Sequence, residues 1–139
     1  MDKEEKTIKT LQEVLAGIPH RLLGGREDLP LAGLSFDSRA VVPSGAFVAI
    51  EGTAADGHDY IDQAIRAGAC AVVLRKTPGE LHPGVTYVQV EDTSRALALM
   101  ARAFYDNPTS RIALVGVTGT NGKTTTATLL YQVFRSMGY

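Results

Sequence analysis

Apolar residues recur along this chain with two different periods, which predict helices that alternate with short strands. Amphipathic helices are predicted at three places. The first spans residues 7–16, with the apolar face Ile8, Leu11, Val14 and Leu15. The second follows Asp56 or Asp59 and ends near Gly68, with the face Ile61, Ala64 and Ile65, and the third is capped by Asp92 or Thr93 and stopped by Pro108, with the face Leu97, Met100, Ala101 and Phe104. Strands are predicted at residues 34–39 (ending in a loop), 46–50, 70–74 and 85–90. Elements of this length and order favour an α/β fold.

The C-terminal part shows a different pattern. The apolar run Ile112–Val115 predicts a buried strand, which breaks into a glycine-rich turn and is followed by a helix. Turn residues cluster at 105–110, so we predict one domain over residues 1–108 and the start of a second, truncated domain over residues 109–139. One strand and one helix bury little apolar surface, so we expect this second part to be weakly ordered or to borrow contacts from a neighbouring molecule.

Composition narrows the class of protein. The 139 residues are 45% hydrophobic and 21% charged, with a formal net charge of −1, which is typical of a globular chain and offers no basic field for nucleic acid. No apolar run approaches membrane-spanning length, and the first nine residues are mixed in charge, unlike a secretory signal. Cys70 is the only cysteine, which excludes an internal disulfide. We therefore expect a cytoplasmic monomer that neither enters membranes nor binds nucleic acid.

The glycine-rich turn has the chemistry of a phosphate-binding loop. Its residues are Gly119, Thr120, Asn121, Gly122, Lys123, Thr124 and Thr125. Glycine lets backbone N–H groups approach an anion, and the following helix adds its N-terminal amides and the positive end of its dipole. Lys123 can reach the β- and γ-phosphates, and the Thr124 hydroxyl can bind Mg²⁺. The loop therefore predicts an ATP site.

This loop departs by one residue from the strict phosphate-loop spacing, because Gly116 lies one position too early and Val117 stands where the first glycine belongs. A surface turn capped by Asn121 is the alternative interpretation, and it leaves the Gly-Lys-Thr sequence unexplained. The preceding apolar run, the following helix and the clustered hydroxyls favour phosphate binding.

Taken together, four segments resemble the Mur ligases of bacterial cell-wall synthesis, and within that family the MurE branch. They are the ATP loop at 113–126, Asp37-Ser38-Arg39 followed by Phe47-Val48-Ala49, the run from Asp56-Gly57-His58-Asp59-Tyr60 to Ala69, and Ala103-Phe104-Tyr105 before Pro108. The resemblance covers the chain from about Leu34 onward. Without it, spacing alone favours a simple turn held by an aspartate side chain for Asp37-Ser38-Arg39. It also favours a residue at a helix start over a metal ligand for His58, because no cysteine or histidine lies at ligand spacing.

The resemblance implies an ATP- and Mg²⁺-dependent amide ligase that adds a diamino acid, meso-diaminopimelate or lysine, to UDP-MurNAc-L-Ala-D-Glu through an acyl phosphate. It assigns UDP-substrate contacts to Phe36, Ser38, Thr53, Ala54 and Ala55. It also implies that the remaining Mg²⁺ ligands, a modified lysine and the selector of the amino acid lie outside these 139 residues, so the chain alone should be inactive.

Three other hypotheses remain open at this stage. A MurF-type ligase shares the N-terminal motifs, although its ATP loop is usually richer in serine. A stand-alone UDP-sugar-binding module could carry a vestigial ATP loop. An unrelated P-loop kinase or GTPase fragment is the third, but such proteins normally begin with the strand that leads into the loop, not with a hundred-residue α/β unit.

Overall fold

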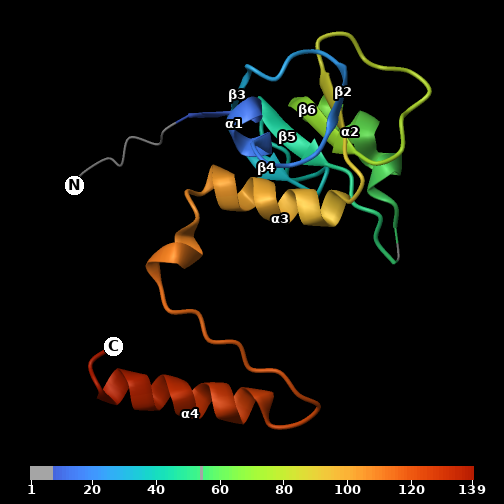
Figure 1. The fold of residues 1–139 in the computed structure, drawn as a ribbon. Helices are drawn as coiled ribbons and strands as arrows, with labels where there is room; N and C mark the ends of the chain where they lie inside the picture. The colour runs from blue at the N-terminus through green and yellow to red at the C-terminus, as the bar shows by residue number, and fades with distance from the viewer. Residues whose placement is uncertain (1–7, 54) are drawn as a thin grey trace. The chain divides into compact units, whose positions relative to one another are not determined.

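The computed structural model describes residues 8–53 and 55–139 (Figure 1). The chain divides into two compact units, one that extends to Asn107 and a second that spans Pro108–Tyr139. Each unit is described by itself below. Among the helices of the described residues, none has both the length and the apolar character needed to cross a membrane.

A five-stranded sheet in the order β2–β7–β6–β5–β4 forms the centre of the first unit. Its strands are β2 (Arg21–Gly24), β4 (Leu34–Ser35), β5 (Gly45–Val48), β6 (Ala69–Leu74) and β7 (Thr86–Gln89). Strands β4, β5, β6 and β7 run parallel to their neighbours, whereas β2 pairs antiparallel with β7 at one edge. A separate antiparallel pair joins β1 (Lys9–Thr10) to β3 (Pro30–Leu31).

Helices cover both faces of this sheet (Figure 1). One face packs against α1 (Leu11–Leu15) and α3 (Thr93–Phe104), and the other packs against α2 (Ile61–Arg66), which follows the 3-10 helix η1 (Gly57–Tyr60). Because side chains alternate along a strand, Ala46 and Val48 of β5 enter the α1/α3 core, while Phe47 enters the α2 core. Both faces are therefore buried, which explains why the central strands read as continuous apolar runs.

Most elements of the first unit were predicted by periodicity, but their boundaries differ. The helix predicted over 7–16 is confirmed only as α1, because Thr10 caps it with a reciprocal Glu13 contact and Lys9–Thr10 form β1 instead. Ile8 is exposed and does not join the apolar face; residue 7 lies outside the described residues. Asp92, not Thr93, caps α3 through a bond from the Arg95 amide.

Strands β2 and β3 were missed by the sequence pattern. Each is short and offers little alternation: Arg21–Gly24 has two adjacent leucines before its glycine, and Pro30–Leu31 begins with proline. Their partners lie far along the chain, since Arg21 pairs with Gln89. Such strands are defined by non-local pairing, which a local period does not reveal.

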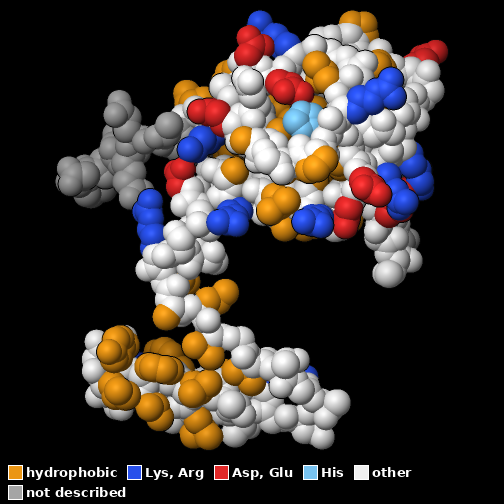
Figure 2. Space-filling model, viewed as in Figure 1, with side chains coloured by type: hydrophobic (Ala, Val, Ile, Leu, Met, Phe, Trp, Pro, Cys, Tyr) orange, Lys and Arg blue, Asp and Glu red, His pale blue; other side chains and the backbone are white. Residues whose placement is uncertain are grey.

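The second unit corrects one prediction. It consists of the 3-10 helix η2 (Pro108–Arg111), an irregular segment and α4 (Lys123–Ser136), so the predicted strand at Ile112–Val115 is wrong. A strand needs a neighbouring strand to satisfy its backbone hydrogen bonds, and residues 108–139 contain no strand that could pair with Ile112–Val115. The helix after the loop is confirmed. Large apolar side chains of α4 are exposed, as Figure 2 shows; they include Leu129, Tyr131, Val133 and Phe134.

Candidate functional site

A cleft of about 730 Å³ opens in the first unit where the parallel strands β4 and β5 end. The carboxyl ends of parallel strands are the usual location of ligand sites in α/β sheets. Three consecutive segments line this cleft: the loop after β4, the segment from β5 to the following hairpin, and the η1–α2 region. The lining residues are Phe36, Asp37, Ser38, Arg39, Phe47, Ile50, Gly52, Ala55, Gly57, Tyr60 and Gln63.

Ser38 is one of few buried polar residues in the described part of the first unit, and it is 7% exposed. Its hydroxyl donates a hydrogen bond to Oε1 of Gln63 at 3.0 Å, which joins the β4 loop to α2. Since the hydroxyl hydrogen is used in this way, the oxygen lone pairs remain the part of the group that can meet a ligand N–H. Phe36 lies at the same cleft with 64% of its surface exposed.

The segment Asp37–Arg39 forms the aspartate-held turn that its sequence suggested. Oδ1 of Asp37 accepts from the Arg39 amide and from Nε of the Arg39 side chain, both at 2.9 Å, and Oδ2 accepts from Nη2 at 2.8 Å. The guanidinium and this amide lower the pKa of Asp37 to about 2. The arginine is thus paired with its neighbouring carboxylate, with most of its side chain in solvent.

Replacing Arg39 with glutamine should return the pKa of Asp37 from about 2 toward its ordinary 3.8. Because the pKa is depressed in the folded state, the pair stabilises the fold above pH 3.8, and that contribution is lost as the pH falls through about 2. A carboxyl-carbon NMR titration measures the pKa, and Arg39→Lys, which keeps the charge without the planar fork, should fall between the two. An unchanged titration of Asp37 in Arg39→Gln would contradict the pairing.

A short hairpin after β5 forms the second wall of the cleft. Glu51 and Asp56 make an isolated antiparallel bridge, and the Gly52 amide donates to the Ala55 carbonyl at 3.0 Å. Of the three predicted contacts in this hairpin, Ala55 lines the cleft, Thr53 is exposed and absent from its lining, and Ala54 lies outside the described residues. The prediction for Thr53 therefore has no support from the cleft.

Gly57 allows the hairpin to return close to the sheet. Its amide donates to the carbonyl of Ile50 at 2.8 Å, and a Cβ at this position would lie 2.6 Å from the Ile50 nitrogen. Backbone atoms cannot yield as a flexible side chain can, so only glycine fits this close approach. This requirement gives a physical reason for glycine in Asp56-Gly57-His58.

The phosphate-loop residues lie in the second unit, where residues 119–122 precede α4 and residues 123–125 belong to its first turn. Gly122 has a φ of 74° and is the N-cap of the helix, without a side-chain cap bond to the first turn. Residues 118–125 are exposed, and the Lys123 ammonium donates to the carbonyl of Gly119 within the loop. A helix of 14 residues that follows a glycine N-cap offers its first amides to an anion.

The charge of the second unit also favours the binding of an anion. Residues 108–139 contain three basic residues, Arg111, Lys123 and Arg135, and no aspartate or glutamate. A Mg²⁺ ion here would have the Thr124 hydroxyl and the phosphate oxygens of a nucleotide as ligands, because the unit supplies no carboxylate. The donor set fits a nucleotide-bound Mg²⁺ and not an independent metal site.

Eight residues that line the cleft were not among the predicted substrate contacts: Asp37, Arg39, Phe47, Ile50, Gly52, Gly57, Tyr60 and Gln63. Gln63 is 25 positions from Ser38, and only the packing of α2 on the sheet brings their side chains together. Tyr60 is half-exposed at the end of η1. The sequence signal available was the Asp56-to-Tyr60 motif itself, which marks the segment but not the direction of its side chains.

Two solved structures with a similar fold are named as ligases. A UDP-N-acetylmuramoylalanyl-D-glutamyl-2,6-diaminopimelate--D-alanyl-D-alanyl ligase from Acinetobacter baumannii covers 86% of the chain with a TM-score of 0.65 at 20% identity, and the chain covers 26% of it. MurF ligase from Thermotoga maritima, in complex with ADP, covers 74% with a TM-score of 0.54 at 35% identity, and the chain covers 23% of it. The α/β fold with its mostly parallel sheet is thus similar to the fold of these structures.

Residues 30–105 match the Mur ligase family, catalytic domain, and the chain belongs to this family. It is 48% identical over 129 residues to a UDP-N-acetylmuramoyl-L-alanyl-D-glutamate--2,6-diaminopimelate ligase of Bacteroides fragilis, which covers 93% of the chain. The chain spans 27% of the length of that relative. The predicted family resemblance is therefore confirmed.

Proposed function

We propose that this chain is the N-terminal part of an ATP-dependent ligase that adds a diamino acid to UDP-MurNAc-L-Ala-D-Glu in peptidoglycan synthesis. The observation that carries the proposal is the 48% identity over 129 residues to a relative named as the 2,6-diaminopimelate ligase for this substrate. That name favours diaminopimelate over lysine as the added residue. Because ATP is the co-substrate, we place the reaction in the cytoplasm.

Each of the two units would bind a different nucleotide. We assign residues 1–108 to the UDP-substrate, supported by the cleft at the ends of β4 and β5, and residues 109–139 to the start of an ATP-binding domain, supported by the loop before α4. The 129 matched residues are 27% of that relative, so we assign the remaining catalytic groups to segments outside the matched part. The 139 residues alone are expected to bind substrate without turnover.

In the proposed reaction, a carboxylate oxygen of the D-Glu residue attacks the γ-phosphorus of ATP, and the bond from that phosphorus to the bridging oxygen breaks to release ADP. The amine of the diamino acid then attacks the acyl-phosphate carbonyl, inorganic phosphate leaves, and the amine loses a proton to give the amide. Lys123 would neutralise charge on the transferring phosphoryl oxygens, and Mg²⁺, held by Thr124 and phosphate oxygens, would do the same.

The cleft residues would recognise the uridine end of the substrate. The Ser38 oxygen, oriented by its bond to Gln63, would accept from the imide N–H of uracil. The exposed ring of Phe36 would cover the base, and the small residues Gly52 and Ala55 would let the ligand approach the hairpin backbone.

Calorimetric titration of the chain with UDP-MurNAc-L-Ala-D-Glu, beside UDP and Mg-ATP, tests this assignment. Ser38→Ala should weaken the UDP-dipeptide by about tenfold, because one hydrogen bond in a buried position is lost. The control Ser94→Ala removes an exposed hydroxyl at the start of α3 and should leave the affinity unchanged. Equal affinity of Ser38→Ala and the unsubstituted chain would remove Ser38 from the site.

A MurF-type ligase is the second candidate, because the Thermotoga maritima MurF ligase is 35% identical to the matched part of the chain. The two candidates differ in the peptide of the UDP-substrate. Titration with the UDP-linked tripeptide separates them: tighter binding of the tripeptide than of the dipeptide would favour the MurF type.

A further inference from the structure

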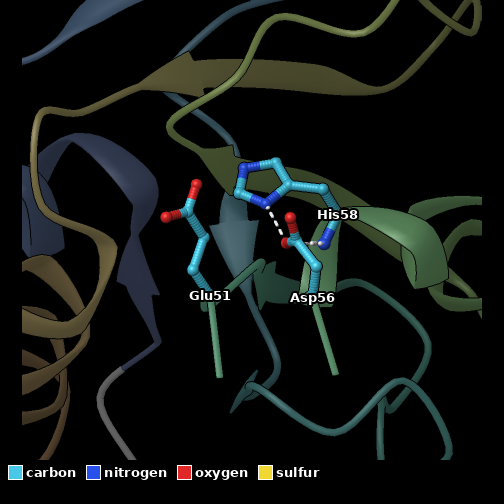
Figure 3. A group of neighbouring side chains, drawn as sticks. All are labelled: Glu51, Asp56 and His58. Atoms are coloured by element: carbon cyan, nitrogen blue, oxygen red, sulfur yellow. Dashed lines mark hydrogen bonds and ion pairs between the residues drawn. The ribbon is translucent and has the colours of Figure 1, made fainter. Parts of the chain in front are cut away.

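Four side chains hold together the hairpin that lines the cleft, and the proposed reaction gives them no role. They are Glu51 and Asp56 on its two strands, His58 just after it, and Lys76 just after β6; we call them the hairpin clamp. Figure 3 shows three of them, with the carboxylates of Glu51 and Asp56 on neighbouring segments and the His58 ring beside Asp56. These three also have the composition of a metal-binding group.

The hydrogen bonds of His58 argue against a metal. Its Nε2 accepts from the amides of Arg75 at 3.0 Å and Lys76 at 3.2 Å, and an amide N–H can only donate. Nε2 is therefore without a proton, so Nδ1 carries it and donates to Oδ1 of Asp56 at 2.6 Å. Both ring nitrogens are occupied, which leaves no lone pair for an ion.

Lys76 occupies the place that a cation would take between the two carboxylates. Its ammonium lies 3.0 Å from Oε1 of Glu51 and 2.8 Å from Oδ2 of Asp56, so one charge bridges both strands of the hairpin. The ammonium, followed by the amide and ring of His58, holds the pKa of Asp56 well below its usual range. The cluster is satisfied by the chain's own groups.

The four clamp side chains lie outside the cleft. Gly52, Ala55 and Gly57 from this region line the cleft, whereas none of the four clamp residues is among its lining residues in the described part of the chain. The His58 side chain is only 10% exposed, and its bonds to Arg75 and Lys76 tie the hairpin base to the end of β6. Loosening the clamp would therefore move a wall of the cleft without removing a ligand contact.

We propose that Lys76 and His58 are positioning residues, which hold the Glu51–Asp56 hairpin in the conformation that receives the nucleotide end of the UDP-substrate. The inference rests on the proposed function for the identity of the ligand. A preorganised wall increases affinity because less conformational entropy is lost on binding. The clamp supplies that preorganisation through four links between the hairpin and the end of β6, namely two ion pairs of Lys76 and two amide hydrogen bonds accepted by His58.

Two substitutions test the clamp by different chemistry. Lys76→Met removes the bridging charge, and His58→Phe keeps a buried ring but removes its hydrogen bonds. In each variant, the Gly52 amide should exchange its hydrogen at least about tenfold faster, while amides of β6 keep their rates. The affinity for UDP-MurNAc-L-Ala-D-Glu should fall about three- to tenfold in both. Lys76→Arg, which can bridge the same carboxylates, should restore both values.

Lys9→Met is the matched control, because it removes an ammonium paired with Asp106 at 2.8 Å and should leave the affinity unchanged. Faster exchange with unaltered affinity would overturn the inference while the proposed function stands. Weaker binding in Lys76→Met but not in His58→Phe would also overturn it, since Lys76 would then act on the ligand by charge alone. If the unsubstituted chain binds no UDP-substrate, the proposed function fails, and the inference fails with it.

Discussion

Replacing Lys123 with alanine should lower ligase turnover at least about hundredfold, because its ammonium is the only side-chain cation of the loop and would face the transferring phosphoryl group. The measurement is phosphate release by a chimera in which residues 1–139 replace the matching segment of the Bacteroides fragilis relative. A charge aligned with the transition state acts more strongly than one that only binds the ground state. The fall should therefore appear in kcat and not only in KM.

Arg135→Ala is the control for this experiment. Arg135 is the other cation of α4, but it lies in the last turn and contacts Tyr131, far along the helix from the loop. Its loss should leave turnover within about twofold of the unsubstituted chimera, as is usual for an exposed residue outside a site. Turnover in Lys123→Ala that matches Arg135→Ala would contradict the role assigned to the loop.

Replacing Phe47 with alanine should lower the free energy of unfolding by about 3–5 kcal/mol, the usual range for deletion of a buried aromatic ring. Phe47 is 0% exposed and packs in the α2 core with Val72 and Tyr87. The small side chain would leave a cavity that neighbouring strands, held by their hydrogen bonds, fill only in part. Urea denaturation followed by circular dichroism measures the change.

Phe36→Ala is the matched control, since it removes the same atoms from a ring that is 64% exposed at the cleft. Its effect on the free energy of unfolding should stay within about 0.5 kcal/mol. The main effect of Phe36→Ala should be on the affinity for the UDP-substrate and not on stability. If the two substitutions lowered stability equally, the burial of Phe47 in solution would be wrong.

Local chemistry explains which features were predictable from the sequence. The strands around Phe47 and Val72 were found because both faces of the sheet are buried and their residues are continuously apolar. The segment from Gly119 to Thr124 could be predicted as a phosphate loop because phosphate binding would require glycine, lysine and a hydroxyl within a few consecutive positions. The family followed from such motifs, whose residues lie next to one another in the chain.

Tertiary structure decided the features that join distant segments. Ser38 meets Gln63, and His58 meets the amides of Arg75 and Lys76, only because α2 packs on the sheet and β6 lies beside β5. The predicted strand at Ile112–Val115 is absent for the same reason, since an apolar run becomes a strand only where a neighbour accepts its hydrogen bonds. The sequence by itself determined the family and most helices and central strands of the first unit, because their signals are local. The cleft and the hairpin clamp depend on contacts between residues 17 or more positions apart, which no local pattern encodes.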